Sequence, residues 1–323
     1  MNILITSASR KVWLVRAFQE ALRMRSGTGR VLTADMDPWS AALYISDGHV
    51  LLPKISDESY VGTIMEICER EDVKLVVPTR DEELRVFSGQ REYFSKRGVS
   101  VMVSDQAAIA TCRDKYQFHG FLKAASFPAL GSWLPGQEPL TSLPYPLCVK
   151  TRFGSGSKHV FKAEDPLEAE FYAARVPDPM AQEFLQGKEY TVDVFVTRGG
   201  KVVSAVVRER VEIVAGESYK SITVKDDRIQ AQAVALVERL GLAGHVTAQC
   251  IKSERGIFFI EINPRFGGGA SLGFKAGAHT PCFLLQELAG EAFAGPLVAY
   301  EEGLVLLKYT SDFFLRADGI SGN

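Results

Sequence analysis

The sequence lacks long apolar runs, an excess of one charge and closely spaced cysteines. No run approaches 18 consecutive apolar residues, so we expect no membrane-spanning helix. The 37 Lys and Arg nearly balance the 39 Asp and Glu, which argues against a protein that coats nucleic acid. The five cysteines form no CxxC pair, and the start does not resemble a signal peptide. We therefore expect a cytoplasmic protein with neither a nucleic-acid nor a membrane partner.

Several familiar catalytic motifs are also absent. The sequence has no HExxH, GxSxG or Walker GxxxxGK[ST], and the first expected strand-to-helix turn, residues 7–11, has no glycine. This argues against NAD, whose pyrophosphate needs glycines at such a turn, although Asp35 follows the second expected strand. The turn could still hold a small anion, and Asp37 and residues 79–81 also follow expected strands. Helix capping is the alternative interpretation of these residues.

The first third of the chain alternates two kinds of segment. Its 323 residues suggest about two domains. Short apolar segments rich in β-branched residues alternate with helical patterns before Ser104, which is typical of a parallel sheet covered on both faces. The expected strands are Asn2–Thr6, Arg30–Ala34, His49–Leu52, Lys74–Pro78 and Val99–Val103. The expected helices are Val12–Met24, Tyr60–Glu71 and Glu82–Lys96. We predict a Rossmann-like domain here.

The pattern changes after Ser104. Strand-like segments with hairpin signals predict an antiparallel sheet with helices beside it. The helices expected in this part are Gln106–Cys112, Lys115–Ala125, Arg228–Leu240 and Cys282–Leu288. Strand-like segments that lie outside the motifs described below are Val202–Arg210 and Leu304–Tyr309.

Residues 245–263 contain the strongest constellation of polar side chains. Two strand-like segments flank a polar turn, and a three-residue loop, Glu254–Gly256, would place Gln249 directly across from Glu261. Because side chains alternate along a strand, Glu261 and Asn263 share a face. The side chains expected on the opposite face are Phe258, Ile260 and Ile262. Three oxygen-bearing side chains would then converge, and Mg²⁺ prefers such ligands.

The segment after this hairpin adds a cation and glycines. Arg265 follows Pro264, and its planar guanidinium suits phosphate or carboxylate. The run Phe266–Gly269 would free the backbone to approach a ligand closely. The alternative is a solvent-facing strand followed by a flexible loop.

A second candidate region suits phosphates. Leu147–Lys150 is strand-like, and the Gly/Ser loop that follows, residues 151–158, leads into another strand. Loop amides and the Lys150 ammonium could bind phosphates, whereas a flexible hairpin tip is the alternative. Lys115, further upstream, could add a second contact or simply be solvated.

A third region could present a strand end to a base. Met180–Leu185 is strand-like and ends at Gln186 and Gly187, where free backbone groups could pair with an adenine edge. Glu189 could accept hydrogen bonds from ribose hydroxyls, or be an ordinary surface carboxylate. The next strand should present Tyr190, Val192, Val194 and Val196 on one face and Thr191, Asp193 and Phe195 on the other.

These regions together resemble the ATP-grasp superfamily. The phrases CVKTRFGSGSKHV, AQEFLQGKEYTVDVF, VTAQC and FIEINPRFGGG occur in that family's order, over residues 113–290. VVPTRDEEL and EINPRFGGG are similar to carbamoyl-phosphate-synthase-like members, including single-chain amino-acid ligases such as the pyrrolysine-pathway ligase. The resemblance implies an α/β Rossmann-like (pre-ATP-grasp) domain over residues 1–112, then an α+β ATP-grasp fold with antiparallel sheets. Its small lobe would span residues 113–187, and its large lobe, with the metal and acceptor site, residues 188–323.

The resemblance also implies roles for individual residues. The implied ATP-binding residues are Lys115, Lys150, Gly154, Ser155, Gly156, Ser157, Glu183, Phe184, Leu185 and Glu189. The implied metal ligands are Gln249, Glu261 and Asn263, for one or two Mg²⁺ ions, with Mn²⁺ as the alternative ion. The implied catalytic residues are Lys150, Arg210 and Arg265. Arg265 would steady the γ-phosphate and then the acyl phosphate, and Arg208 and Arg210 resemble arginines near the acceptor.

The implied activity is ATP-dependent carboxylate–amine ligation through an acyl phosphate, on an amino acid or a small carboxylic acid. The partners would be small-molecule substrates, and a homodimer is left open. One alternative is a kinase-like or carbamoyl-phosphate-synthase-like enzyme that releases a phosphorylated product. Another is a non-catalytic ATP-binding protein. Room for only one ATP-grasp half, and the lack of a glutaminase nucleophile, argue against carbamoyl phosphate synthesis.

Overall fold

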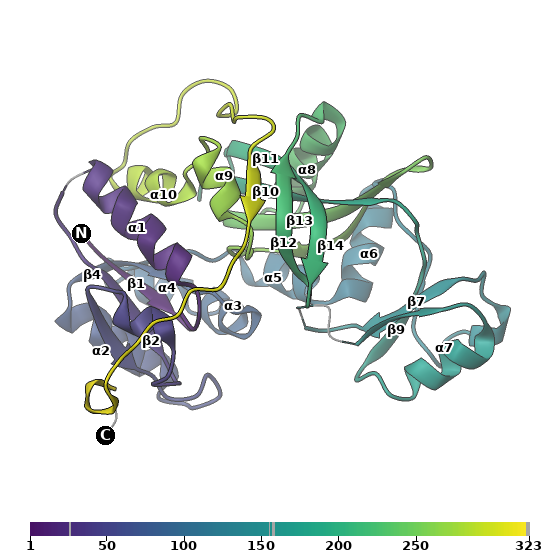
Figure 1. The fold of residues 1–323 in the computed structure, drawn as a ribbon, viewed down its shortest axis with the longest axis horizontal. Helices are drawn as coiled ribbons and strands as arrows, with labels where there is room; N and C mark the ends of the chain where they lie inside the picture. Colours follow the sequence, from purple (N-terminus) through teal and green to yellow (C-terminus); the bar gives the residue numbers. More distant parts are fainter. Residues whose placement is uncertain (26, 155, 157–158, 321–323) are drawn as a thin grey trace.

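The strands of the protein form three sheets that follow one another along the chain (Figure 1). The computed structural model describes all residues except 26, 155, 157–158 and 321–323. A parallel sheet near the N-terminus lies at the left of Figure 1, and a four-stranded sheet with helix α7 (Pro166–Ala173) lies at the right. The six-stranded sheet lies between them.

The N-terminal sheet has the order β3-β2-β1-β4-β5, and all its neighbouring strands are parallel. Its strands are β1 (Asn2–Thr6), β2 (Val31–Asp35), β3 (Gly48–Leu51), β4 (Val73–Val77) and β5 (Ser100–Val101). The chain leaves β1 toward β2 and leaves β4 toward β5, so the order reverses between β1 and β4. This confirms the predicted Rossmann-like sheet, and such a reversal is where open α/β sheets bind ligands.

Helices cover both faces of this sheet. The side chains of Ile3 and Ile5 pack with Phe18 on one face, whereas Leu4 packs with Ile64 on the other. The covering helices are α1 (Val12–Arg25), α2 (Tyr60–Arg70), α3 (Asp81–Ser88) and α4 (Arg91–Ser95). Burial on two faces explains why the strands are apolar throughout instead of alternating.

The predicted helix Glu82–Lys96 is wrong in one respect. It is two helices, because α3 ends at Ser88 and α4 begins only at Arg91. Gly89, the residue after α3, has a poor intrinsic preference for helix. Phe87 and Phe94 remain in contact across the break, with ring centroids 5.5 Å apart, so both short helices still bury their apolar faces.

The other two sheets are mostly antiparallel hairpins. The four-stranded sheet has the order β6-β9-β7-β8 and the six-stranded sheet β14-β13-β10-β11-β12-β15. The first contains β6 (Ser132–Trp133), β7 (Leu147–Thr151), β8 (Val160–Ala163) and β9 (Pro179–Glu183). The second contains β10 (Lys188–Val196), β11 (Val202–Val214), β12 (Glu217–Thr223), β13 (Gly244–Ser253), β14 (Gly256–Asn263) and β15 (Val305–Leu307). Their pairing is antiparallel, as predicted.

One face of the six-stranded sheet carries the largest apolar core. The predicted alternation of β10 is confirmed, because Tyr190, Val192, Val194 and Val196 all lie in this core. Side chains of α5 (Gln106–Arg113), α6 (Lys115–Ala124) and α8 (Asp227–Arg239) pack against it. The opposite face of β10 carries the buried polar side chains Thr191 and Asp193.

The remaining elements are short. They are α9 (Ser271–Lys275), α10 (Thr280–Leu288) and the 3-10 turns Ala41–Tyr44, Leu140–Ser142 and Ala317–Gly319. Helix α7 and strand β12 were not expected from the sequence. Among the described residues, no helix combines the length and apolarity needed to cross a bilayer. The domain limits at 112/113 and 187/188 stay predictions.

Candidate active site

The β13–β14 hairpin brings Gln249 opposite Glu261, as predicted, but by a different route. Ser253 pairs with Gly256, so the turn has two residues, and the predicted three-residue loop is wrong. A β-bulge between the pairs formed by Gln249 and Cys250 then adds one residue to β14 and restores the register. The turn is one residue shorter than predicted and the bulge adds one residue, so the two differences cancel.

The bulge also changes which side chains of β14 share a face. Phe259 and Ile262 both lie in the large core, whereas Phe258 packs with Leu185, and Ile260 lies against the same cluster. The prediction that Ile262 shares a face with Phe258 and Ile260 is therefore wrong. A simple alternation cannot continue across a bulge, because the extra residue moves every later side chain to the other face.

The oxygen-bearing side chains at the hairpin end contact one another and nearby cations. Asn263 Nδ2 donates to Glu261 Oε1 at 2.6 Å, and Gln249 Oε1 accepts from Arg210 at 3.0 Å. Asn263 Oδ1 accepts from Arg265 at 3.3 Å. Each oxygen keeps lone pairs beyond these bonds, so one carboxylate and two amides suit a Mg²⁺ ion that takes its other ligands from phosphates.

Arg210 lies between the implied ribose and metal residues. Its Nη1 donates to Glu189 Oε2 at 3.1 Å as well as to Gln249, and its Nε donates to Ser218. Nη2 donates to the Gly216 carbonyl at 2.8 Å. These four bonds leave about one of the five guanidinium N–H groups for a ligand. Arg210 is thus well placed to hold Glu189 and Gln249 together.

Arg265 is held by a residue of the N-terminal domain. Its Nε and Nη2 donate to the two oxygens of Asp81 at 2.7 and 2.9 Å, a bidentate pair between β14's end and α3. Burial lowers the pKa of Arg265, but the carboxylates of Asp81, Glu261 and Glu82 together raise it, and the net change is upward. The guanidinium therefore stays charged and oriented beside Asn263.

The glycine run packs mainly against protein side chains. A Cβ on Gly267 would lie 2.8 Å from Thr247 Oγ1, and one on Gly269 would lie 2.8 Å from the Arg208 guanidinium. Both glycines are thus required for close packing, a use that the sequence analysis did not foresee. Gly268 is different, since a Cβ there would meet the Lys308 ammonium and the Glu217 carboxylate at 3.2 and 3.3 Å.

Lys150 is buried and bound to an amide that sequence reasoning missed. Its Nζ donates to Gln182 Oε1 at 2.8 Å, and Gln182 Nε2 contacts Ser132 Oγ and His119 Nε2. Burial lowers the pKa of Lys150, and Lys115 lowers it further, whereas Cys148 and Glu261 raise it. A bound phosphate would favour the charged ammonium again.

Strand pairing and burial explain the contacts of Gln182 with Lys150 and His119. Cys148 pairs with Gln182 and Lys150 with Met180, so Lys150 and Gln182 are diagonal neighbours on one face. Burial lowers the pKa of His119 to about 3, with Lys150 contributing, so its imidazole is neutral and can accept from the Gln182 amide.

Lys115 contacts the Gly/Ser loop. Its Nζ donates to the Gly154 carbonyl at 2.6 Å, and Asp114 forms a bidentate pair with Arg152 at the loop's start. Gly154 and Gly156 have φ values of 100° and 80°, which other residues rarely adopt. The implied loop residues Ser155 and Ser157 lie outside the described residues.

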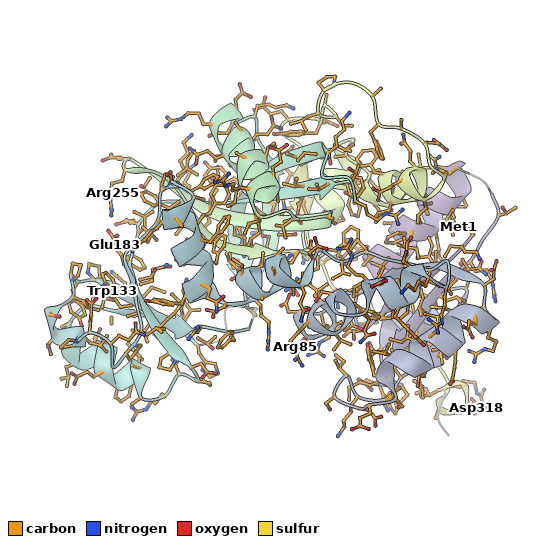
Figure 2. All side chains as sticks on the ribbon, turned by 180° about the vertical axis from the view of Figure 1, so that it is seen from behind. Met1, Arg85, Trp133, Glu183, Arg255 and Asp318 are labelled. Carbon is orange, nitrogen blue, oxygen red and sulfur yellow. The ribbon has the colours of Figure 1, made fainter. Side chains whose placement is uncertain are left out.

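The strand end at residues 183–185 leaves one backbone donor for a base. The N–H groups of Glu183 and Phe184 donate to the Gly131 and Pro146 carbonyls at 2.8 and 3.1 Å. Leu185 N–H has no acceptor among the described residues. The Glu183 side chain forms an ion pair with Arg255 of the β13–β14 turn, and Figure 2 shows the two side by side. The pair joins β9 to the large sheet.

A cavity is lined by some of the implied phosphate-binding and metal-binding residues, but not by Lys150 or Gln249. It has a volume of about 370 Å³, and Lys115, Gly154, Glu261 and Asn263 line it. Asp81 lines another part of its wall. This size suits the charged end of a nucleotide and a small co-substrate.

Comparisons with known proteins identify two domains. The family described as "PylC-like, N-terminal domain" matches residues 3–102, and the ATP-grasp domain family matches residues 112–269. The carbamoyl phosphate synthase large chain of Clostridium acetobutylicum is 21% identical over 226 residues. That match covers 64% of this chain but 21% of the relative, so the chain spans about a fifth of that protein's length.

Solved structures share the fold. A biotin carboxylase complex with β-γ-ATP from Campylobacter jejuni matches with a TM-score of 0.76 at 17% identity, over 93% of this chain and 73% of the other. An L-amino acid ligase from Bacillus licheniformis matches with a TM-score of 0.72 at 18% identity, over 89% and 73%. At these identities, the likeness concerns the fold.

Proposed function

The chain belongs to the ATP-grasp superfamily, with a PylC-like N-terminal domain before its ATP-grasp domain, and from this we propose that it is an ATP-dependent carboxylate–amine ligase. Its substrates would be an amino acid or small carboxylic acid and an amine. The observation that carries the proposal is the cavity shared by Lys115, Glu261 and Asn263. The cavity supports the proposal because one lysine and two oxygen-bearing side chains share its lining.

The nucleotide would bind between the four-stranded and six-stranded sheets. Lys115 and Lys150 would hold phosphates beneath the loop that contains Gly154, and the free Leu185 N–H would pair with adenine. Glu189 would accept from the ribose. Leu185, Phe258 and Leu130 already form an apolar cluster there, which suits the face of a base.

The chemistry would proceed in two displacements. A carboxylate oxygen of the acid attacks the γ-phosphorus, and the bond to ADP breaks, giving an acyl phosphate. The neutral amine then attacks the acyl carbon, inorganic phosphate leaves, and the amine loses a proton. Mg²⁺ bound by Gln249, Glu261 and Asn263 would neutralise phosphate charge. Arg265, fixed by Asp81, would steady the transferred phosphoryl group.

The test is an isotope-transfer assay. Each candidate acid, labelled with ¹⁸O in its carboxylate, is incubated with ATP, Mg²⁺ and amines. The masses of the products are then measured by mass spectrometry. We expect an amide, ADP and phosphate carrying one ¹⁸O. Release of acyl phosphate without an amide would instead indicate a kinase-like enzyme. Tight ATP binding without ADP release, over a panel of all common amino acids and small acids, would contradict the ligase.

Two finer assignments remain part of the proposal. Mg²⁺ is the expected ion, and activity with Mn²⁺ alone would test the alternative. A homodimer stays a prediction, which light scattering of the purified protein can test. Titration with EDTA in the ADP-release assay, followed by rescue with either ion, checks the metal requirement.

A further inference from the structure

The turn between β1 and α1, residues 7–11, lies where the strand order of the N-terminal sheet reverses. Ser7 and Ser9 adopt φ values of 47° and 48°, a region that L-residues other than Asn and Asp seldom occupy. Ser9 N–H donates to Asp35 at 2.8 Å, and Thr79 Oγ1 donates to the Ser7 carbonyl at 2.7 Å. Neighbouring strands therefore hold the turn in one conformation.

The carboxylates around this turn already have partners. Asp35 accepts from Ser9 and Asp37 N–H, and Glu83 accepts from the Tyr60 hydroxyl and from backbone N–H groups after β4. Two further carboxylates are paired with cations: Asp81 with Arg265, and Glu217 with Lys308 at 2.7 Å. Asp81 and Glu217 are thus paired with cations, whereas Asp35 and Glu83 accept from uncharged donors and keep their negative charge.

Two cations at the turn, Lys11 and the exposed Arg10, form no ion pair among the described residues. Lys11 Nζ donates to the Ser7 carbonyl at 3.1 Å and forms no ion pair with any described carboxylate. An ammonium has three donors, so two remain. Arg10 likewise has no hydrogen bond or ion pair within the described part of the chain. Lys11 is half-buried, so water can satisfy its donors only in part.

The charges around Lys11 are of both signs. Burial lowers its pKa, Glu83 and Asp35 raise it, and Arg265 and Arg80 lower it. A bound anion would stabilise the charged ammonium against the burial and the two arginines. The contacts place Lys11 and Arg265 at the same edge of the sheet. Lys11 Nζ and Thr79 Oγ1 both donate to the Ser7 carbonyl, and Asp81, two residues after Thr79, binds Arg265.

The glycine run begins beside α1, because Phe266 packs against Phe18 with ring centroids 6.0 Å apart. Gly268 has no side chain between its backbone and the Glu217–Lys308 pair. Lys308 lowers the pKa of Glu217 by its hydrogen bond, and the charges of Arg10 and Lys11 add to this effect. The β1–α1 turn and Arg265 thus lie near each other, and the glycine run begins beside α1.

We propose that the acid substrate carries a second anionic group, bound by Lys11 and Arg10, while its reacting carboxylate lies beside Arg265. This rests on the proposed ligase function and specifies its substrate class. A dicarboxylate or a phosphorylated acid would fit, since both supply an anion to the two cations. An acid with a single carboxylate would leave the Lys11 donors unpaired.

The test uses acids that differ only in the second anion. Binding of glutarate against pentanoate, glutamate against glutamine, and O-phosphoserine against serine is measured by calorimetry. The wild-type chain is saturated with a non-hydrolysable ATP analogue and Mg²⁺. We expect about tenfold to hundredfold tighter binding of the dianionic member in at least one pair, the usual effect of one charge-assisted hydrogen bond. The phosphoserine pair separates phosphate from carboxylate recognition.

Variants assign the effect to the turn. Lys11→Met and Arg10→Gln should each reduce the preference for the dianion, and Lys11→Arg should retain part of it. Arg16→Gln, on the exposed face of α1, is the matched control and should leave the preference unchanged. Affinity for the ATP analogue should stay within about twofold in all four variants, because none contacts the nucleotide site. Circular dichroism checks that each variant is folded.

Two results would overturn this inference. One is equal affinity for both members of every pair, and the other is a preference that survives in the double variant Lys11→Met, Arg10→Gln. Neither result depends on turnover, so the ligase proposal could still stand on the isotope assay. Conversely, a binding preference without amide formation would support the anion site and contradict the ligase proposal.

Discussion

The end of the β13–β14 hairpin and the β1–α1 turn both carry cations, but they differ in how these are paired. At the hairpin, Arg265 is bound to Asp81 through two hydrogen bonds, and Asn263 is bound to Glu261. At the turn, Lys11 has one bond to a carbonyl, and Arg10 has none within the described residues. The hairpin cation is paired with a carboxylate of the protein. The cations of the turn keep hydrogen-bond donors that no described residue accepts, and these donors are available to a ligand.

This difference separates residues that would serve phosphoryl transfer with any substrate from residues that would recognise one particular substrate. Phosphoryl transfer depends on positioned charge, so residues that hold Mg²⁺ and ATP benefit from being fixed before the ligand arrives. Residues that recognise a particular substrate need donors that the protein itself does not satisfy. Mutations in the two regions should therefore have different signatures.

The largest expected effect is that of Glu261→Gln at the end of the hairpin. It removes the only carboxylate among the implied metal ligands, so Mg²⁺-dependent ADP release should fall by at least about 100-fold. Glu254→Gln, in the exposed turn of the same hairpin, is the control and should retain full activity. Near-normal turnover of Glu261→Gln across Mg²⁺ concentrations would remove the metal assignment.

Lys150→Met should have the next largest effect. If Lys150 contacts phosphate as proposed, the loss of its buried ammonium should weaken ATP binding by about tenfold or more. It also leaves Gln182 Oε1 without its donor. Calorimetry with an ATP analogue measures the effect, and Lys123→Met, on the exposed side of α6, is the control. Unchanged affinity would contradict the phosphate role of Lys150.

Asp81→Asn sharpens the comparison, because it makes Arg265 resemble the unpaired Lys11. Without the carboxylate the guanidinium loses its fixed orientation, so kcat should fall about tenfold while KM for ATP changes little. Glu92→Gln on α4 serves as the exposed control. A selective rise in the KM for ATP, with kcat intact, would place Asp81 in nucleotide binding instead.

Arg255→Gln should have the smallest effect. The pair with Glu183 joins two sheets that would enclose the nucleotide, but Arg255 is exposed, and exposed pairs contribute little. We expect a change of less than about fivefold in KM for ATP, and none at high salt, where such charges are screened. A larger change that persists in high salt would mean that the contact closes the site.

Much of the fold follows from local patterns. The apolar strands before Ser104 and the alternation of Tyr190 to Val196 each predict an element that the structure contains, since burial on two faces or one face leaves its own periodicity. The β13–β14 hairpin is instructive because its register was predicted through a wrong loop length. Neither the two-residue turn nor the compensating bulge leaves a clear signal in the sequence.

By itself, the sequence determined the types of side chain and their order, including the oxygen donors of the hairpin and the lysines near the Gly/Ser loop. Only the tertiary structure decided their partners. Asp81 and Arg265 are 184 residues apart in the chain, and Lys150 and Gln182 are 32 apart. The first contact depends on how the N-terminal domain packs against the end of β14, and the second depends on which strands pair in the four-stranded sheet. Local periodicity carries no information about either. The same packing leaves Lys11 with donors to spare.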